Sequence, residues 1–211
     1  MLPLGPPKFK RRKAERPDEI IAAALVLFAE KGFAAARLDD IAARAGVSKG
    51  ALYLYFPTKQ DMFRAVVEQA VGPNLANAQQ MATGDLAFAD LVRNMMGVMA
   101  HMAANSPLGG IAKMVIAEAG NFPELATIWY ERSIAPVFSL LTALIAQGQA
   151  RGEIRPGDPR QYALSLVSPT VLGVVWRETF TPVGAPPFDL PALAKQHVET
   201  MLRGMLMEPT P

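Results

Sequence analysis

Cysteine is absent from the 211-residue chain, and histidine occurs only at His101 and His197. The absence of cysteine excludes a disulfide scaffold and any thiolate metal site. The two histidines lie far apart in the sequence, and neither a Gly-rich phosphate loop nor a carboxylate pair beside a base is present. An enzyme therefore has little support, and we expect no catalytic residue, no metal and no cofactor.

Long apolar runs are also missing, because none reaches the ~18 residues that a membrane span requires. The best candidate, residues 134–146, is shorter and predicts a buried helix. At the N-terminus the charged residues follow a short apolar patch that prolines interrupt, which is the opposite of a secretory signal. The sequence therefore predicts a cytoplasmic protein.

Charge is distributed unevenly, although the net charge is only +2. Residues 1–64 contain 12 Lys/Arg and 7 Asp/Glu, whereas residues 65–211 contain 9 and 12. A basic N-terminal part joined to a mildly acidic body favours contact with a polyanion. The alternative is a solvated charged tail, most of all for the cationic run at residues 8–13.

Helical periodicity runs through the whole chain, and no stretch shows convincing strand alternation. In the N-terminal part we expect helices from about residue 17 to Lys31, over 38–45, from the N-cap Ser48 to about Phe56, and from Thr58 to about Val71. Further helices are expected over 85–104, 108–119, 123–150, 159–179 and 190–207. The sequence thus predicts an all-α fold.

The helix over residues 48–56 has two different faces. Leu52 and Phe56 form an inner side, while Lys49 and Tyr53 lie together on another side with Gly50 beyond them. Glycine in an exposed helix costs ~1 kcal/mol relative to alanine, which is easier to understand if a partner approaches the backbone closely. The major groove of DNA, ~12 Å wide, admits such a helix. A generic helical corner is the alternative.

Three motifs carry a family resemblance: IIAAALVLFAEKGF (20–33), LDDIAARAGVSKGALYLYF (38–56) and PTKQDMF (57–63). Residues 18–63 resemble the DNA-binding domain of the TetR/AcrR family of bacterial transcriptional regulators. The resemblance implies an N-terminal three-helix helix-turn-helix domain joined by the fourth helix to a C-terminal helical bundle for ligand binding and dimerisation. We therefore expect a flexible basic extension over 1–16, a DNA-binding domain over 17–64 and an effector-binding and dimerisation domain over 65–211.

Residue roles carried over from the resemblance place DNA contacts on the second to fourth helices. The expected DNA-binding residues are Arg37, Ser48, Lys49, Gly50, Ala51, Tyr53, Tyr55 and Lys59, with Arg11, Arg12 and Lys13 of the N-terminal extension. Two positions depart from the family pattern. Arg37 stands where the family often has a capping Thr, and Leu54 stands where a polar residue commonly meets the DNA backbone.

The C-terminal part is rich in methionine and aromatic residues, which line adaptable apolar pockets. Since the family places its effector site among these helices, we expect a small hydrophobic effector. The candidate ligand-binding residues are Met99, His101, Met102, Met114, Trp129, Tyr130, Phe138 and Trp176. The alternative for the methionines is an ordinary core.

The last two expected helices carry apolar faces that would form a four-helix bundle between two subunits. The candidate dimerisation residues are Leu166, Val171, Val175, Leu193, His197, Met201, Leu202 and Met205. An internal core is the alternative. A homodimer would present two recognition helices ~34 Å apart, which suits a palindromic operator.

The sequence therefore predicts a repressor that releases a palindromic operator in double-stranded DNA when a small hydrophobic effector binds. An activator of the same family is an alternative. A helical ligand carrier that does not bind DNA is another, but it leaves the basic N-terminal part and Gly50 unexplained.

Overall fold

The computed structural model describes residues 16–83 and 86–207, and within these residues the chain is helical with only one isolated β-bridge, between Ile154 and Leu206. The predicted all-α fold is confirmed. The expected contacts at Arg11, Arg12 and Lys13 lie outside the described residues. The elements are α1 (Arg16–Ala35), α2 (Leu38–Arg44), α3 (Lys49–Tyr55), α4 (Lys59–Ala82), α5 (Phe88–Asn105), α6 (Leu108–Glu118), α7 (Pro123–Trp129), the π-helical turn η1 (Tyr130–Ile134), α8 (Ala135–Ala150), α9 (Pro159–Thr179), the 3₁₀ turn η2 (Thr181–Val183) and α10 (Leu190–Met205).

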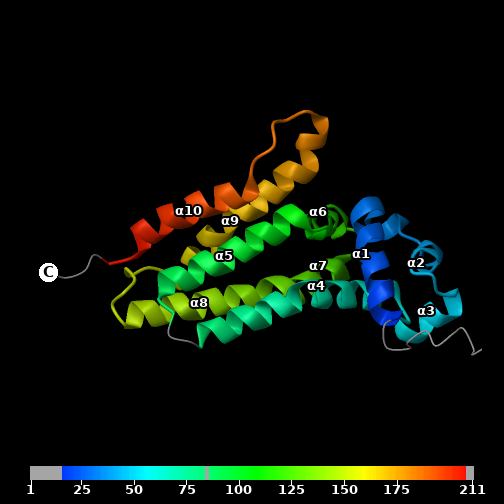
Figure 1. Cartoon of the computed structure of the whole chain (residues 1–211), viewed down its shortest axis with the longest axis horizontal. Coiled ribbons are helices and arrows are strands. Elements are labelled where there is room, and N and C mark those ends of the chain that lie inside the picture. The colour runs from blue at the N-terminus through cyan, green and yellow to red at the C-terminus, as the bar shows by residue number, and fades with distance from the viewer. Residues whose placement is uncertain (1–15, 84–85, 208–211) are drawn as a thin grey trace, which may run out of the picture.

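The molecule is elongated, with α1, α2 and α3 grouped at one end (Figure 1). These three helices and the first turn of α4 are called the head below. The helices α4, α5 and α8 run lengthwise away from the head, and α9 and α10 lie beside α5. The connection between α9 and α10 projects from the body. The long α4 thus connects the head to the C-terminal domain.

Local capping signals define the helices of the head. The Ser48 side chain accepts a hydrogen bond from the Ala51 amide, and the Thr58 side chain accepts one from the Asp61 amide. Both predicted caps are confirmed. Arg37 occupies the cap position of α2 without making a side-chain cap, as its chemistry requires.

The fourth helix is longer than the sequence predicted. α4 continues through Gly72 and Pro73 to Ala82, whereas we expected it to end near Val71. Proline removes one backbone donor and crowds the preceding turn, but it does not prevent later residues from being helical. Ala78 and Met81 pack against the core of the C-terminal domain, and this burial supports the extension.

The segment Pro123–Ala150 forms one helical run in which η1 joins α7 to α8. By length and composition this run could cross a membrane, although core helices of soluble proteins pass the same test. Only 22% of its most apolar window is buried within the chain. Part of the remaining apolar surface lines the cavity described below.

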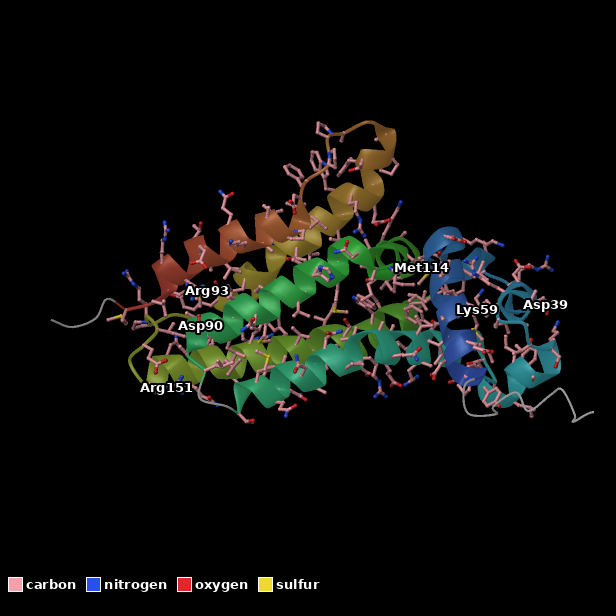
Figure 2. The ribbon with its side chains drawn as sticks, viewed as in Figure 1. Asp39, Lys59, Asp90, Arg93, Met114 and Arg151 are labelled. Carbon is pink, nitrogen blue, oxygen red and sulfur yellow. The ribbon has the colours of Figure 1, made fainter. Side chains whose placement is uncertain are left out.

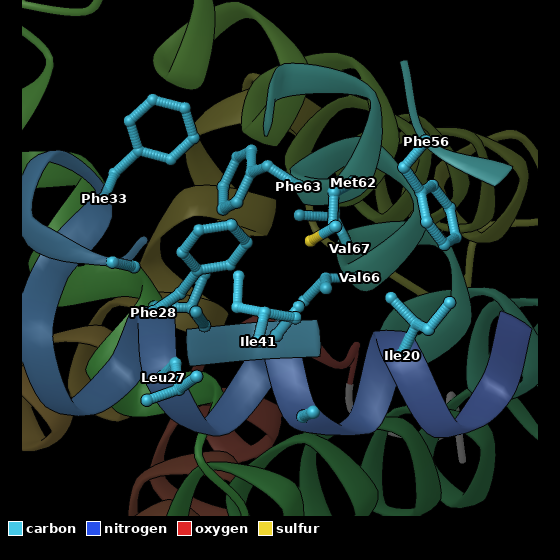
Figure 3. Close-up of a cluster of buried hydrophobic side chains, with 14 of the residues drawn as sticks. Ile20, Leu27, Phe28, Phe33, Ile41, Phe56, Met62, Phe63, Val66 and Val67 are labelled. Carbon is cyan, nitrogen blue, oxygen red and sulfur yellow. The ribbon is translucent and has the colours of Figure 1, made fainter. Parts of the chain in front are cut away.

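The core of the head is aromatic (Figure 3). Phe33 lies 5.5 Å from Phe28, 6.0 Å from Phe63 and 5.3 Å from Phe122, measured between ring centroids. Buried residues of α6 and α7, which belong to the C-terminal part of the chain, complete this core: Ile111, Met114, Val115, Leu125 and Ile128. The packing of the head therefore depends directly on α6 and α7.

The second core is aliphatic and lies among α5, α8, α9 and α10. It is built mainly from leucine, isoleucine, valine and methionine, with Phe88 at one end. Val92, Leu141 and Ile145 are examples of its fully buried members. The C-terminal domain thus has its own hydrophobic centre, away from the head.

Candidate DNA-binding surface and apolar cavity

The recognition surface is the outer face of α3. Leu52 and Phe56 are buried against α1 and α2, so the opposite face points to solvent. Lys49 and Gly50 are exposed, and Tyr53 retains 42% of its accessible surface. A Cβ added at Gly50 would meet no atom within 4 Å. Nothing inside the described chain therefore demands glycine at this position.

Two further candidate DNA-binding residues of α3 are less exposed than Lys49 and Gly50. Ala51 is partly exposed, whereas Tyr55 packs partly against the core of the head. Leu54 is 84% exposed, the largest exposed fraction among the large apolar side chains described. Its side chain cannot hydrogen-bond to phosphate, so the departure from the family pattern at this position stands in the structure.

Lys49 already has an acidic neighbour. Its ammonium nitrogen lies 2.9 Å from an Asp39 carboxylate oxygen on α2, and the hydrogen bond that Lys49 donates to Asp39 raises the pKa of Lys49. The Asp39 side chain is exposed and was not singled out from the sequence. Asp39 can compete with a DNA phosphate for the Lys49 ammonium. Whether Lys49 can bind a phosphate therefore depends on this residue of α2.

Arg37 and Lys59 lie on either side of this surface and differ in how far their side chains are held by the head. Arg37 is exposed at the start of α2. Lys59 lies 4.6 Å above the Phe33 ring centroid and donates a 3.2 Å hydrogen bond to the Ala34 carbonyl. Burial lowers the pKa of Lys59, although the attraction of Glu118 opposes that change. Lys59 is therefore held against the head, while Arg37 is free to reach outward.

A cavity of about 670 Å³ lies among α4, α5, α6, η1, α8 and α9, and it opens to solvent where Ile116, Leu164 and Val171 are more than half exposed. Its walls are mostly apolar, and five residues with uncharged polar side chains lie among them: Asn74, Asn77, Asn94, Ser133 and Thr170. No Asp, Glu, Lys, Arg or His lines the cavity in the part of the chain that the structure describes. Because an isolated charge is costly to bury, such a cavity suits an uncharged molecule.

The structure brings half of the candidate ligand-binding residues to this cavity and places the others elsewhere. Met99, Met102, Trp129 and Phe138 line it. His101 is exposed on an adjoining surface hollow, where Asn105 contacts its ring.

The remaining three candidates lie apart from the cavity lining. Met114 is buried in the core of the head, and Tyr130 is 58% exposed. Trp176 packs with Phe180 and Phe188 at the α9–α10 connection and donates to the Pro186 carbonyl.

The candidate dimerisation residues are also divided. Leu166, Leu202 and Met205 are buried within the single chain, in the core of the C-terminal domain. Val171 is 54% exposed and is flanked by Leu172 at 65%. The partly exposed candidates are Val175, Leu193, His197 and Met201. Among these candidates only Val171 is exposed, and both Val171 and Val175 also line the cavity, so the apolar surface of α9 at Leu172 borders the cavity.

Sequence reasoning missed the α4 side of the cavity. Asn74, Asn77 and Met81 follow Pro73, beyond the predicted end of that helix. Their spacing of three and four residues was the available signal, because it places them on one helix face. The prediction ended the helix before Pro73, so this face was not recognised.

Comparison with known protein families covers most of the chain. A model described as bacterial regulatory proteins, tetR family, matches residues 20–66, and a model described as tetracyclin repressor-like, C-terminal domain, matches residues 80–186. The uncharacterized HTH-type transcriptional regulator YfiR of Bacillus subtilis (strain 168) is 31% identical over 88 residues, which cover 42% of this chain and 43% of YfiR. Three such curated relatives are matched over only 43%, 25% and 42% of their own lengths.

Solved structures share the fold across nearly the whole chain. A SmeT–triclosan complex has a TM-score of 0.74 at 20% identity, covering 93% of this chain and 99% of SmeT. FadR from Bacillus subtilis in complex with stearoyl-CoA has a TM-score of 0.69 at 20% identity, covering 89% and 98%. At this identity the likeness establishes the fold alone.

Proposed function

Since the chain belongs to the tetR family of bacterial regulatory proteins, it is a ligand-responsive transcriptional regulator, and we propose that it is a repressor that releases a palindromic operator when a small hydrophobic effector fills its cavity. Members of the family act by binding DNA rather than by catalysis. We propose that this regulator acts in the cytoplasm as a homodimer.

The outer face of α3 carries the DNA-binding part of the proposal. It offers an ammonium from Lys49, a phenol from Tyr53 and open backbone at Gly50. Charged and hydroxyl groups fix a protein on phosphates, and a bare stretch of helix lets the backbone approach base edges. Arg37 and Ser48 extend this surface, with smaller contributions from Ala51, Tyr55 and Lys59.

The test is selection of bound duplexes from a random pool, followed by titration of binding with salt. We expect a palindromic consensus and an affinity that falls steeply as salt rises. The double variant Lys49→Ala/Tyr53→Ala should lose at least about 30-fold in affinity if each contact contributes ~1 kcal/mol or more. Lys195→Ala/Tyr130→Ala removes the same two residue types from exposed positions outside the head, and it should bind like the parent. Absence of binding at low salt would overturn the proposal.

The cavity carries the effector part of the proposal. Its apolar walls and uncharged polar groups fit a neutral molecule that is mainly hydrophobic and accepts or donates a few hydrogen bonds. The SmeT–triclosan complex supports the use of this fold for a small apolar ligand. Stearoyl-CoA, found with FadR, joins an apolar acyl chain to a charged CoA group, and the uncharged lining of this cavity matches only the acyl part. For this chain we propose the neutral aromatic or aliphatic class.

Fluorescence gives the test, because Trp129 lines the cavity and Trp176 lies outside it. Titration with triclosan, and with matched neutral and charged aromatic compounds, should change the emission of Trp129 only for the neutral ones. The Trp129→Phe variant should lose the signal, and Trp176→Phe should keep it. Tighter binding of the charged compounds would contradict the proposed class.

The outer face of α9 carries the dimer part of the proposal. Val171 and Leu172 are exposed there beside the smaller Ser165 and Ser168. Sedimentation of the full chain should give a dimer, and Leu172→Asp, at a position outside the cavity lining, should give a folded monomer with weakened operator binding. A reporter gene under the selected operator separates repressor from activator, since deletion of a repressor raises expression.

A further inference from the structure

Glu118, the last residue of α6, contacts the backbone of the head. Its two carboxylate oxygens accept hydrogen bonds from the amides of Phe33, at 2.9 Å, and Ala34, at 2.8 Å. These partners are 85 and 84 residues away in sequence. The contact therefore adds two hydrogen bonds to the apolar packing that already joins the C-terminal domain to the head.

The local structure of α1 explains why these amides are available. Gly32 has φ of 81° and ψ of 170°, which interrupts the helix before a last turn at Phe33–Ala36. The first amides of a helical turn have no partner within that turn, and a carboxylate satisfies them well. A Cβ at Gly32 would collide with the Glu118 carboxylate, so glycine is required here both for its φ and for this approach.

Lys59 belongs to the same cluster. Its ammonium donates to the Ala34 carbonyl and lies above the Phe33 ring, while Glu118 attracts it. Lys59 stands in the first turn of α4, the helix that leaves the head for the C-terminal domain. Figure 2 shows Lys59 beside α1. One carboxylate thus influences both the end of α1 and the beginning of α4.

The same short helix forms part of the cavity wall. Ala112, Val115 and Ile116 line the cavity within two turns of Glu118. On its other side α6 packs closely on α1, where a Cβ added to Gly110 would lie 3.0 Å from the Cβ of Ala29. A ligand that pushes on Ala112 or Val115 therefore pushes on a helix of 11 residues whose last residue is Glu118.

We propose that Glu118 is a positioning residue that couples the occupancy of the cavity to the geometry of the head. In the empty protein its carboxylate holds the turn after Gly32, and through it α2 and the recognition helix. Filling the cavity displaces α6, withdraws the carboxylate from Phe33 and Ala34, and lets the head move away from the geometry that binds DNA. This inference rests on the proposed function and identifies the contact through which it is regulated.

The first experiment compares Glu118→Gln with Glu131→Gln in the full-length protein, with triclosan as the probe. Glu131 is an exposed residue on η1 and provides the matched control. We expect the probe to bind both variants like the parent, as measured by Trp129 emission. In the parent and in Glu131→Gln the probe should weaken operator binding by about 5–150-fold, the usual range of allosteric coupling. In Glu118→Gln this factor should fall below about threefold.

The second experiment needs neither DNA nor a ligand, so it tests the contact if the first fails. Amide hydrogen exchange at Phe33 and Ala34 should accelerate at least about tenfold in Glu118→Ala, as expected when local opening becomes easier. Ala112→Trp, which fills the cavity from within, should accelerate the same two amides. Glu131→Ala should leave them unchanged.

Unchanged exchange in both Glu118→Ala and Ala112→Trp would overturn the inference, and so would full coupling in Glu118→Gln. Failure of the parent protein to bind any selected DNA would instead contradict the proposed function, whatever the exchange rates show. The two failures are therefore distinguishable.

Discussion

The head and the C-terminal domain fill their interiors in different ways. In the core of the head, Phe28, Phe33 and Phe63 pack with Phe122 of the C-terminal part at centroid distances of 5.3–6.0 Å. In the C-terminal domain an aliphatic core lies beside a cavity of about 670 Å³. Close packing is the rule for protein interiors, and a large apolar void forgoes stabilising contacts. The comparison indicates that the head has a closely packed, rigid core, whereas the C-terminal domain has space for a ligand.

The largest expected effect comes from opening the core of the head. Phe63→Ala should destabilise the protein by about 3–5 kcal/mol, because the ring is fully buried against Phe28 and Phe33. Phe138→Ala, at a partly buried residue that lines the cavity, should cost clearly less. Urea unfolding of the full chain measures both changes. Equal losses would contradict the proposed difference between the two interiors.

A smaller effect is expected when both interiors are overfilled. Val66→Phe adds volume to the packed core of the head and should cost about 1–3 kcal/mol. Val137→Phe adds the same volume at the cavity wall, so its stability should change by less than about 1 kcal/mol while ligand affinity falls. Thermal unfolding and Trp129 titration provide the measurements. If Val137→Phe proved as costly as Val66→Phe, the cavity would not be open space in the folded protein.

A substitution at Gly50 tests whether the glycine lowers the stability of the head in order to let DNA approach the helix backbone. Gly50→Ala should stabilise the isolated protein by up to about 1 kcal/mol, because a Cβ there meets nothing and alanine favours the helix. The same methyl group should reduce operator affinity if the backbone approaches DNA at that point. Unfolding and binding measurements on one preparation compare the two changes. A variant that is more stable and binds unchanged would show that the DNA does not come close to Gly50.

The smallest expected effect concerns the Asp39–Lys49 ion pair on the head surface. Asp39→Asn should free Lys49 for a phosphate, which steepens the logarithmic salt dependence of DNA binding by about one unit. Affinity at low salt should rise severalfold. Asp90→Asn removes an exposed carboxylate that pairs with Arg93 in the C-terminal domain and serves as the control. An unchanged salt dependence in Asp39→Asn would mean that Lys49 keeps its intramolecular partner on DNA.

The local sequence determined most of the head. Caps at Ser48 and Thr58, the buried pair Leu52 and Phe56, and the exposed Gly50 could all be predicted, because capping and helix periodicity act within a few residues. The expected helices from residue 85 onward also match the observed elements closely. Short-range physics is sufficient for these features.

Only the tertiary structure decided what each apolar face contacts. Periodicity marks a face of α6, α9 or α10 as apolar but does not name the neighbour, which is why Met114 packs in the head and Leu202 in the core of a single chain. The extension of α4 beyond Pro73, the cavity, and the contact of Glu118 with the backbone at Phe33 depend on groups brought together from distant parts of the chain. Their energy comes from burial and hydrogen bonding across that distance, and no local pattern encodes it.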